Sequence, residues 1–281
     1  MISVVVPTFN SEKTIFKTIS SILNQSYEEF EIIIIDNHST DSTKAIVESF
    51  DNSCINFYLI RNQGMPAISR NYGISIAKYD YVAFCDSDDF WEKDKLISCV
   101  DCIKRGFSFI AHDLKISGSL SKSLWNRIFF RQRTKTYSDF IEFGNSISQS
   151  SVVIKRKILL DLGSYTTDPR FIAVEDVHLW AKILKSGVEL CYIKKRLVTL
   201  RYSDYALSSS ANQFRAHRSL RLEYFSDYKP AWYKYNIATY LLRKKMYRRG
   251  HFYLRSLLFS RKCPLELRLK SLVLLARLCI H

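Results

Sequence analysis

The stretch YVAFCDSDDFW, residues 81–91, sets an apolar strand directly against three carboxylates. Tyr81 to Cys85 is an apolar run typical of a buried strand, and Asp86, Asp88 and Asp89 follow it at once. Carboxylates this close raise one another's pKa unless a cation neutralises them. A hard divalent ion such as Mg²⁺ or Mn²⁺ takes oxygen ligands and often keeps phosphate oxygens in its shell. In this context the pattern favours a metal site that grips a diphosphate over a solvated acidic turn.

The residues before this stretch alternate between short apolar strands and helical segments. Ser11 is the expected N-cap of the first helix. Strands are predicted at 3–6, 31–35, 55–60 and 81–85, and helices at 11–24, 42–50 and 67–77. This alternation predicts an α/β fold with a mostly parallel, doubly wound, Rossmann-like sheet. Ligands of such sheets bind at the carboxyl ends of the strands. Polar clusters follow three of these ends, at 7–10, 36–41 and 86–89.

The pattern is looser beyond residue 107. Strands are expected at 110–116, 151–154, 190–193 and 197–202, and helices at 155–162 and 175–186. Glu175 and Asp176 open the last of these helices. Negative charge is favoured there by the helix dipole, which is the simpler interpretation. The functional interpretation is a general base held at a rigid helix start.

Two further charged residues have a structural and a functional interpretation. Asp36 follows a buried strand, where it could accept a hydrogen bond from a ribose hydroxyl or simply cap a turn. Arg70 could pair with phosphate or a metal-bound carboxylate, or be an ordinary surface arginine. The chain contains neither GxGxxG nor GxxxxGK[ST], which counts against dinucleotide-binding and P-loop proteins.

The charge is concentrated in the last quarter of the chain. The net charge of the 281 residues is +15, and residues 212–281 carry 16 Lys and Arg against three Asp and Glu. This shift predicts a boundary near residue 211. Basic residues mixed with aromatics at helical spacing suit helices lying on an anionic membrane. A helical cap with a solvated basic face is the simpler interpretation. Nucleic acid is not expected as a partner, because no RNA-binding signature accompanies the charge.

The cysteines and the hydropathy pattern indicate the compartment. Seven cysteines, an odd number at irregular spacing, predict reduced thiols in the cytosol. The N-terminus has no basic segment typical of a signal peptide, and no apolar run reaches the roughly 18–20 residues of a membrane span. We therefore expect a cytoplasmic protein, peripheral on the inner face of the cell membrane.

Taken in order, four stretches resemble family 2 of the glycosyltransferases, enzymes of the GT-A fold that use nucleotide-diphosphate sugars. They are SVVVPTFNSEKTIFKTISSILNQSYEEFEIIIIDNHSTDST, GMPAISRNYGISIAKYDYVAFCDSDDFW, NSISQSSVVIKRKILLDLGSY and EDVHLWAKIL. The resemblance implies a GT-A domain over 1–211, with a nucleotide-sugar-binding half at 1–106 and an acceptor and catalytic half at 107–211. Residues 212–281 would then be a basic, aromatic helical appendage that associates with the membrane.

The resemblance also implies roles for individual residues. Asp88 would ligate the Mn²⁺ or Mg²⁺ ion, and Asp176 would be the catalytic base with Glu175 beside it. Many relatives carry an Arg-x-His pattern in the final loop, whereas here Ser203 stands where the histidine would fall. Residues expected to contact the donor are Pro7, Thr8, Asn10, Asp36, Ser39, Arg70, Asp86, Asp89 and Arg201, with Asp41 supporting its loop. Residues expected to border the acceptor are Asn145, Ser150 and Ser151.

The activity implied is inverting transfer of a hexose or N-acetylhexosamine from a UDP-sugar to a hydroxyl group. The expected acceptor is a lipid-linked oligosaccharide, a glycan on polyprenyl diphosphate used for bacterial O-antigen or capsule synthesis. Two alternatives remain from the residues alone. One is a metal-dependent phosphotransferase or nucleotidyltransferase, and the other is a non-catalytic, membrane-bound scaffold.

Overall fold

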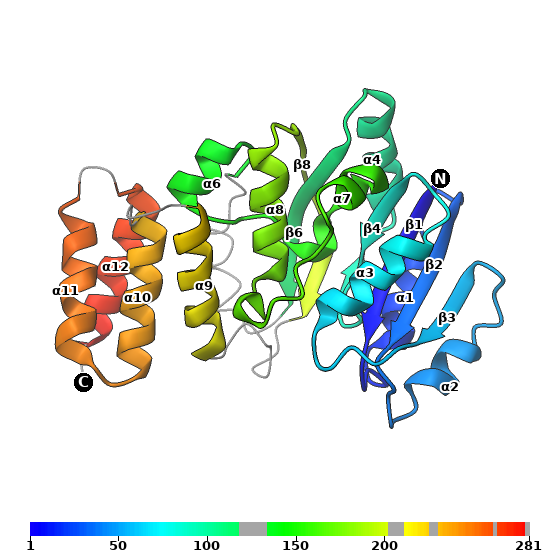
Figure 1. Cartoon of the computed structure of the whole chain (residues 1–281), viewed down its shortest axis with the longest axis horizontal. Helices are drawn as coiled ribbons and strands as arrows, with labels where there is room; N and C mark the ends of the chain where they lie inside the picture. Colours follow the sequence, from blue (N-terminus) through cyan, green and yellow to red (C-terminus); the bar gives the residue numbers. More distant parts are fainter. Residues whose placement is uncertain (118–133, 202–210, 225–229, 261–262, 279–281) are drawn as a thin grey trace.

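The computed structural model describes residues 1–117, 134–201, 211–224, 230–260 and 263–278 (Figure 1). Its strands are β1 (Ile2–Thr8), β2 (Phe30–Asp36), β3 (Ile55–Leu59), β4 (Tyr81–Phe84), β5 (Phe90–Trp91), β6 (Phe109–Ser117), β7 (Val153–Lys155) and β8 (Leu190–Arg201). Its α-helices are α1 (Ile15–Leu23), α2 (Thr43–Glu48), α3 (Pro66–Ile76), α4 (Lys95–Lys104), α6 (Tyr137–Phe143), α7 (Arg156–Asp161), α8 (Glu175–Lys185), α9 (Ala211–Tyr224), α10 (Ala231–Arg243), α11 (Tyr247–Leu258) and α12 (Leu265–Leu278). Two 3-10 turns are η1 (Gln149–Ser151) and η2 (Pro169–Phe171).

The strands form one eight-stranded sheet in the order β3-β2-β1-β4-β7-β6-β8-β5. The first four strands are parallel, as the alternating sequence predicts. The second half is mixed, because β7 runs antiparallel to both β4 and β6 while β8 runs parallel to β6. The α/β prediction is therefore confirmed, with a parallel first half and a mixed second half.

Two of the differences between predicted and observed boundaries bear on the fold. The segments 190–193 and 197–201 form a single strand, β8, whose middle residues Lys194–Arg196 are exposed beside a register shift opposite Asp113, and residue 202, predicted as the end of the second segment, lies outside the described residues. The charged side chains of Lys194–Arg196 lie at this irregularity, where they reach solvent. The first helix begins at Ile15 rather than Ser11, because the backbone and side chain of Ser11 bond to Thr43 and Ser87 of neighbouring loops.

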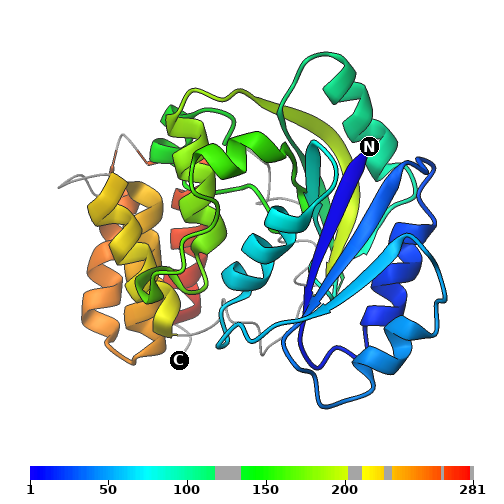
Figure 2. The same cartoon turned by 45° about the vertical axis from the view of Figure 1, so that its right-hand side comes forward.

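Both faces of the sheet are covered by helices (Figure 2). Alternate residues of β1 point to opposite sides, so Val4 and Val6 pack in the cluster that contains α1 and α4 residues. Val5 packs on the other side with residues of α3 and α8. Near-continuous apolar strands follow from this burial on both faces, as in Ile32–Ile35 of β2.

The C-terminal helices α10, α11 and α12 pack together at the end of the molecule remote from β3 (Figure 1). Trp232, Tyr233 and Ile237 of α10 belong to the same apolar cluster as α8 and the sheet. The Trp232 indole N–H donates to the carbonyl of Ile141 in α6, at 3.2 Å. No helix within the described ranges is long and apolar enough to span a bilayer.

Candidate functional site

Three polar loops meet at one edge of the sheet. β2, β1 and β4 are neighbours and run parallel, so their carboxyl ends lie together. Thr8 pairs with Asp36 at the ends of β1 and β2, and β4 ends at Phe84, just before the acidic loop Asp86–Asp89. The register therefore confirms that the three polar clusters share one edge.

The first two loops are joined by hydrogen bonds around Asp36. This buried carboxylate accepts from the backbone N–H of Ser39 at 2.9 Å and from its hydroxyl at 2.5 Å. The Ser39 hydroxyl accepts in turn from the N–H of Asn10 at 2.8 Å. The amide oxygen of Asn10 accepts from the N–H of Thr40 at 2.9 Å. Asp36, Ser39 and Asn10 thus tie the first two loops together at this edge.

Neighbouring residues complete this edge. Asp41 accepts from the N–H groups of Glu12 and Thr43, both at 3.0 Å, so it supports the loop as expected. Pro7 is buried in β1. Thr8 is buried too, and its hydroxyl has no hydrogen-bond partner among the residues described.

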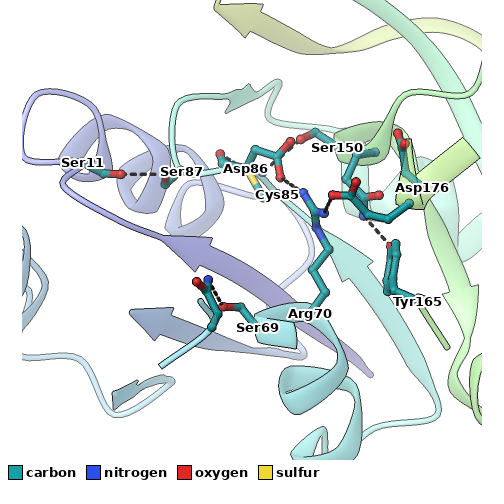
Figure 3. Close-up of polar contacts among 12 residues, drawn as sticks. Ser11, Ser69, Arg70, Cys85, Asp86, Ser87, Ser150, Tyr165 and Asp176 are labelled. Atoms are coloured by element: carbon teal, nitrogen blue, oxygen red, sulfur yellow. Dashed lines mark hydrogen bonds and ion pairs between the residues drawn. The ribbon is translucent and has the colours of Figure 1, made fainter. Parts of the chain in front are cut away.

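The acidic loop is held from three sides (Figure 3). Its Asp86 N–H donates to the Ser150 hydroxyl at 3.0 Å, and the hydroxyls of Ser87 and Ser11 lie 2.8 Å apart. The Thr18 hydroxyl donates to the Ser87 carbonyl at 2.9 Å. The turn closes with a bond from the Asp89 N–H to the Asp86 carbonyl, at 3.0 Å. The carboxylates are therefore fixed close together despite their repulsion.

That repulsion appears in their pKa values. Burial raises the pKa of Asp88, and the charge of Asp86 raises it further, against the opposing effect of Arg201. Burial and then Asp86 raise the pKa of Asp89 well above its usual range, although the Ser150 hydroxyl opposes this. The N–H of Arg201 also donates to Asp89, at 3.3 Å. The neighbouring arginine therefore does not fully offset the negative charge of the loop, and a bound cation would offset more of it.

Arg70 connects the acidic loop to the start of α8. Its Nη2 lies 2.9 Å from Asp86 Oδ1, and its Nη1 lies 3.1 Å from Glu175 Oε1. Only 8% of the Arg70 side chain is exposed, and its guanidinium also lies over the Tyr165 ring, 5.6 Å from the centroid. Figure 3 shows this side chain between the acidic loop and Asp176. Arg70 is therefore a positioning residue that fixes the distance between loop and helix.

Asp176 stands at the first turn of α8 beside this ion-pair network. Burial raises its pKa to about 7, the charge of Glu175 adds to the rise, and Arg70 opposes it. Its Oδ1 accepts from the Val177 N–H at 2.7 Å. A carboxylate with a pKa near neutrality can accept a proton from a hydroxyl group more readily than an ordinary aspartate. Glu175 contributes by charge and by its bond to Arg70.

Three residues without a predicted role complete the site. Asn71 bonds both backbone groups of Tyr165, at 2.8 and 2.9 Å, and the Gln149 amide donates to the Tyr165 hydroxyl at 2.7 Å. Tyr165 also packs edge-on against Phe84, directly before the acidic loop. All three lie inside the stretches that carry the family resemblance. The bonds between Asn71 and Tyr165 join positions 94 residues apart, and the sequence alone does not reveal such a contact.

The residues expected to border the acceptor differ in burial, because Asn145 is half-buried while Ser150 and Ser151 are buried. Ser150 and Ser151 are fully buried in η1, where Ser150 supports the acidic loop and Ser151 donates to the Ser148 carbonyl. Asn145 closes a turn with Ile147. Ser203, in the final loop that lacks the expected histidine, lies outside the described residues.

Comparison with known proteins identifies the relatives of this arrangement. The sequence model of the family "Glycosyl transferase family 2" matches residues 3–160. The chain is 32% identical over 224 residues to the Escherichia coli "UDP-Glc:alpha-D-GlcNAc-diphosphoundecaprenol beta-1,3-glucosyltransferase WfaP", covering 76% of this chain and 82% of that protein. It is 27% identical to the Bacillus subtilis "Putative teichuronic acid biosynthesis glycosyltransferase TuaG", covering 88% of this chain and 98% of that protein.

Solved structures agree on the fold. S. aureus TarS 1–349 in complex with UDP-GlcNAc superimposes with a TM-score of 0.62 at 20% identity, covering 95% of this chain and 82% of that one. The Pyrobaculum calidifontis mannosyltransferase PcManGT, in complex with GDP-Man and Mn²⁺, gives a TM-score of 0.65 at 18% identity, covering 100% and 80%. The fold is that of the GT-A glycosyltransferases, with additional C-terminal helices.

Proposed function

Because the chain belongs to glycosyl transferase family 2, we propose that it transfers a hexose or N-acetylhexosamine from a UDP-sugar to a hydroxyl of a polyprenyl-diphosphate-linked glycan, with inversion. The observation that carries the proposal is the network in which Arg70 joins the acidic loop to the Asp176 end of α8. It sets a site suited to a diphosphate against a carboxylate suited to proton removal. The name of WfaP describes a UDP-glucose donor and a diphosphoundecaprenol-linked acceptor, which supports both substrate classes.

The donor would occupy the edge formed by the first two loops. Asp36 is buried and fixed by Ser39, so its carboxylate can receive a hydrogen bond from uracil or ribose with little reorganisation. Pro7, Thr8 and Asn10 would border the nucleotide. Asp86 would reach the ribose, Asp89 the sugar hydroxyls, and Arg201 the phosphates.

A divalent cation fits the acidic loop. Mn²⁺ and Mg²⁺ prefer oxygen ligands, and Asp88 and Asp89 have pKa values raised by burial and by the charge of Asp86. Across the described ranges no group of three His, Cys, Asp or Glu side chains is arranged to hold a metal by itself. We therefore assign Asp88 as the protein ligand, with donor phosphates completing the shell. A bound cation supplies positive charge for the departing diphosphate.

Asp176 would act on the acceptor. Its carboxylate takes the proton of the acceptor hydroxyl, and that oxygen forms a bond to the anomeric carbon of the donor sugar. The bond between the anomeric carbon and the diphosphate oxygen breaks on the opposite face, and UDP leaves with the electron pair. One displacement inverts the anomeric centre, so an α-linked donor gives a β-linked product. The name of WfaP, a beta-1,3-glucosyltransferase that uses UDP-Glc, fits this outcome.

The same proposal includes a place for the protein. Lipid-linked acceptors are held at a membrane, and the basic C-terminal helices suit the anionic inner face of the bacterial cell membrane. We propose a peripheral, cytoplasmic enzyme of surface polysaccharide synthesis, such as that of O-antigen or capsule.

The test is a transfer assay with a panel of UDP-sugars and undecaprenyl-diphosphate-linked GlcNAc. We expect UDP release coupled to a β-linked product, identified by NMR, and loss of both in the Asp176→Asn variant. Release of pyrophosphate would instead favour the nucleotidyltransferase alternative. UDP release that is unchanged by Asp176→Asn would remove Asp176 from the mechanism.

A further inference from the structure

The helix α11 has one face that packs inside the protein and one that does not. Gly250, Leu254 and Leu257 are buried. Gly250 allows the close approach of α10, since a Cβ there would lie 2.7 Å from Leu242 Cδ2. This face fixes α11 against its neighbours, and the opposite face is left without contacts to the core.

The opposite face carries a basic–aromatic stripe, formed by Arg248, Phe252, Arg255 and Phe259. The spacing of four, three and four residues places them in one row along the helix and its C-cap. The two phenylalanines are 70% and 85% exposed, and both arginines are exposed as well. Exposed aromatic side chains in a regular row, alternating with cations, are not needed for the packing of α11.

The next helix, α12, repeats the spacing with apolar residues. Leu265, Leu269 and Leu272 recur at intervals of four and three, and they are 71%, 43% and 53% exposed. The adjacent helices α11 and α12 pack against each other, so the end of the molecule drawn in orange and red in Figure 1 carries two exposed rows with apolar members. Exposed apolar groups that recur in this way mark interaction surfaces.

The charge around these rows has a single sign. Between residues 231 and 265 there are nine Lys and Arg and no Asp or Glu. A second copy of this chain would bring like charges together at the stripe, which disfavours self-association there. A partner that complements this surface offers negative charge for the arginines, and an apolar interior for the phenylalanines that begins within one side-chain length of that charge.

We propose that the basic–aromatic stripe of α11 docks the protein on an anionic phospholipid bilayer, with Phe252 and Phe259 inserted among the acyl chains and Arg248 and Arg255 on lipid phosphates. Such division of labour is how amphipathic helices lie in the membrane interface. The inference deepens the membrane association proposed above by naming the surface. It requires no sugar donor, so it can fail or hold independently of the glycosyltransferase activity.

The test is flotation of the purified full chain with vesicles of phosphatidylcholine alone or with phosphatidylglycerol added. The wild type is expected to float with the anionic vesicles and to be released by salt. Arg248→Glu/Arg255→Glu should weaken this binding by at least about tenfold, given roughly 1 kcal/mol for each basic residue at the surface. Phe252→Ala/Phe259→Ala should weaken the binding by a similar factor. The size of this loss should depend little on salt concentration, because it reflects lost insertion of apolar side chains.

Two matched variants control for charge and for lost aromatic area. Lys93→Glu/Lys104→Glu makes the same change of net charge on exposed lysines at and beside α4, and Phe16→Ala removes a phenylalanine that is 58% exposed on α1. Both should bind vesicles as the wild type does. Circular dichroism confirms that each variant is folded.

Three results would overturn the proposal. They are absence of wild-type binding to anionic vesicles, equal binding by the stripe variants, and self-association that the stripe variants abolish while vesicle binding persists. Transfer to a water-soluble acceptor analogue should be unchanged in the stripe variants. If the wild type floats with anionic vesicles but does not transfer sugar to this analogue, the result would count against the proposed function alone.

Discussion

A carboxylate that must remove a proton at neutral pH has to be held in surroundings that disfavour its charge. Asp176 meets this condition, since burial and then Glu175 raise its pKa to about 7. Arg70 limits the rise and also fixes Glu175 in place. The same two neighbours therefore set both the position and the proton affinity of the proposed base.

This arrangement predicts the pH dependence of transfer. A base with a raised pKa is protonated below that pKa, so kcat/KM should increase with pH through a midpoint near 7. Glu175→Gln removes a charge that raises this pKa, so the midpoint should move to lower pH. Asp176→Asn should reduce kcat by about 10²–10⁴-fold above about pH 7, and by less at lower pH, where the wild-type carboxylate is itself protonated. Initial rates measured from pH 5 to about 9 check this, and a midpoint that Glu175→Gln leaves in place would contradict it.

Arg70 is predicted to be a large contributor to stability. Arg70→Met leaves Asp86 and Glu175 without their shared partner at a largely buried position, which should cost about 3–5 kcal/mol of the free energy of unfolding. Arg70→Lys should recover only part, because an ammonium cannot bridge two carboxylates in the fork geometry of arginine. Urea unfolding gives the comparison. Arg170→Met, which breaks the exposed pair with Asp168, is the control and should change little.

Lys95 lies fully buried behind the acidic loop. Its ammonium is 3.3 Å from the Trp91 ring centroid, and burial lowers its pKa to about 8. Because the folded protein binds this proton less tightly than the unfolded chain does, the charge costs stability below pH 8, and the cost disappears between about pH 8 and 10.5.

Lys95→Met should therefore raise the free energy of unfolding at pH 7, by on the order of 2 kcal/mol. The gain should shrink as the pH rises toward 10. Thermal or urea unfolding at several pH values measures it, with the exposed Lys104→Met in the same helix as control. A loss of stability at pH 7 would show that the buried ammonium makes a contact worth more than its desolvation.

At the level of elements, the position of α3 over the sheet depends on one glycine. A Cβ at Gly73 would lie 2.5 Å from Cγ1 and 3.0 Å from Cγ2 of Val5 in β1. Because α3 carries Arg70 and Asn71, this close approach also sets how far the guanidinium reaches toward the acidic loop. The packing of an element and the geometry of the site are thus linked through one contact.

Gly73→Ala should cost about 1–3 kcal/mol of the free energy of unfolding through overpacking, although alanine favours a helix. Combining it with Val5→Ala should cost less than the sum of the two single changes, since the smaller side chain leaves room for the added methyl. Ser75→Ala, at an exposed position of the same helix, is the control. Strictly additive costs would contradict the close contact.

The elements also show why the sequence predicts one half of the sheet better than the other. In 1–106 the strands β1, β2 and β4 are near-continuous apolar runs ended by polar residues, so these strands and the meeting of their loops follow from pattern and topology. Beyond 107 the strands pair in mixed directions, and β8 contains exposed charges in its middle. Local pattern does not encode which strand lies beside which.

At the scale of the whole molecule, the site is assembled from distant segments. The acidic loop, Arg70 and Glu175 could each be chosen from the sequence as candidate site residues, because a carboxylate or an arginine at the end of a strand or helix is typical of binding and catalytic sites. Their ion pairs, across 16 and 105 residues, could not. The same limit applies to Tyr165, whose ring packs against Phe84 and whose backbone is bonded to Asn71. Its role depends wholly on tertiary packing.

The assignment of the acidic loop to the donor diphosphate is tested by calorimetric titration with UDP, with and without Mn²⁺, on the wild type and on Asp88→Ala, with GDP and CMP for comparison. We expect UDP to bind more tightly with Mn²⁺, and this metal-dependent gain to be lost in Asp88→Ala while the variant remains folded. Absence of nucleotide binding by folded wild-type protein, or equal Mn²⁺ dependence in the variant, would contradict the assignment of the acidic loop to the donor diphosphate.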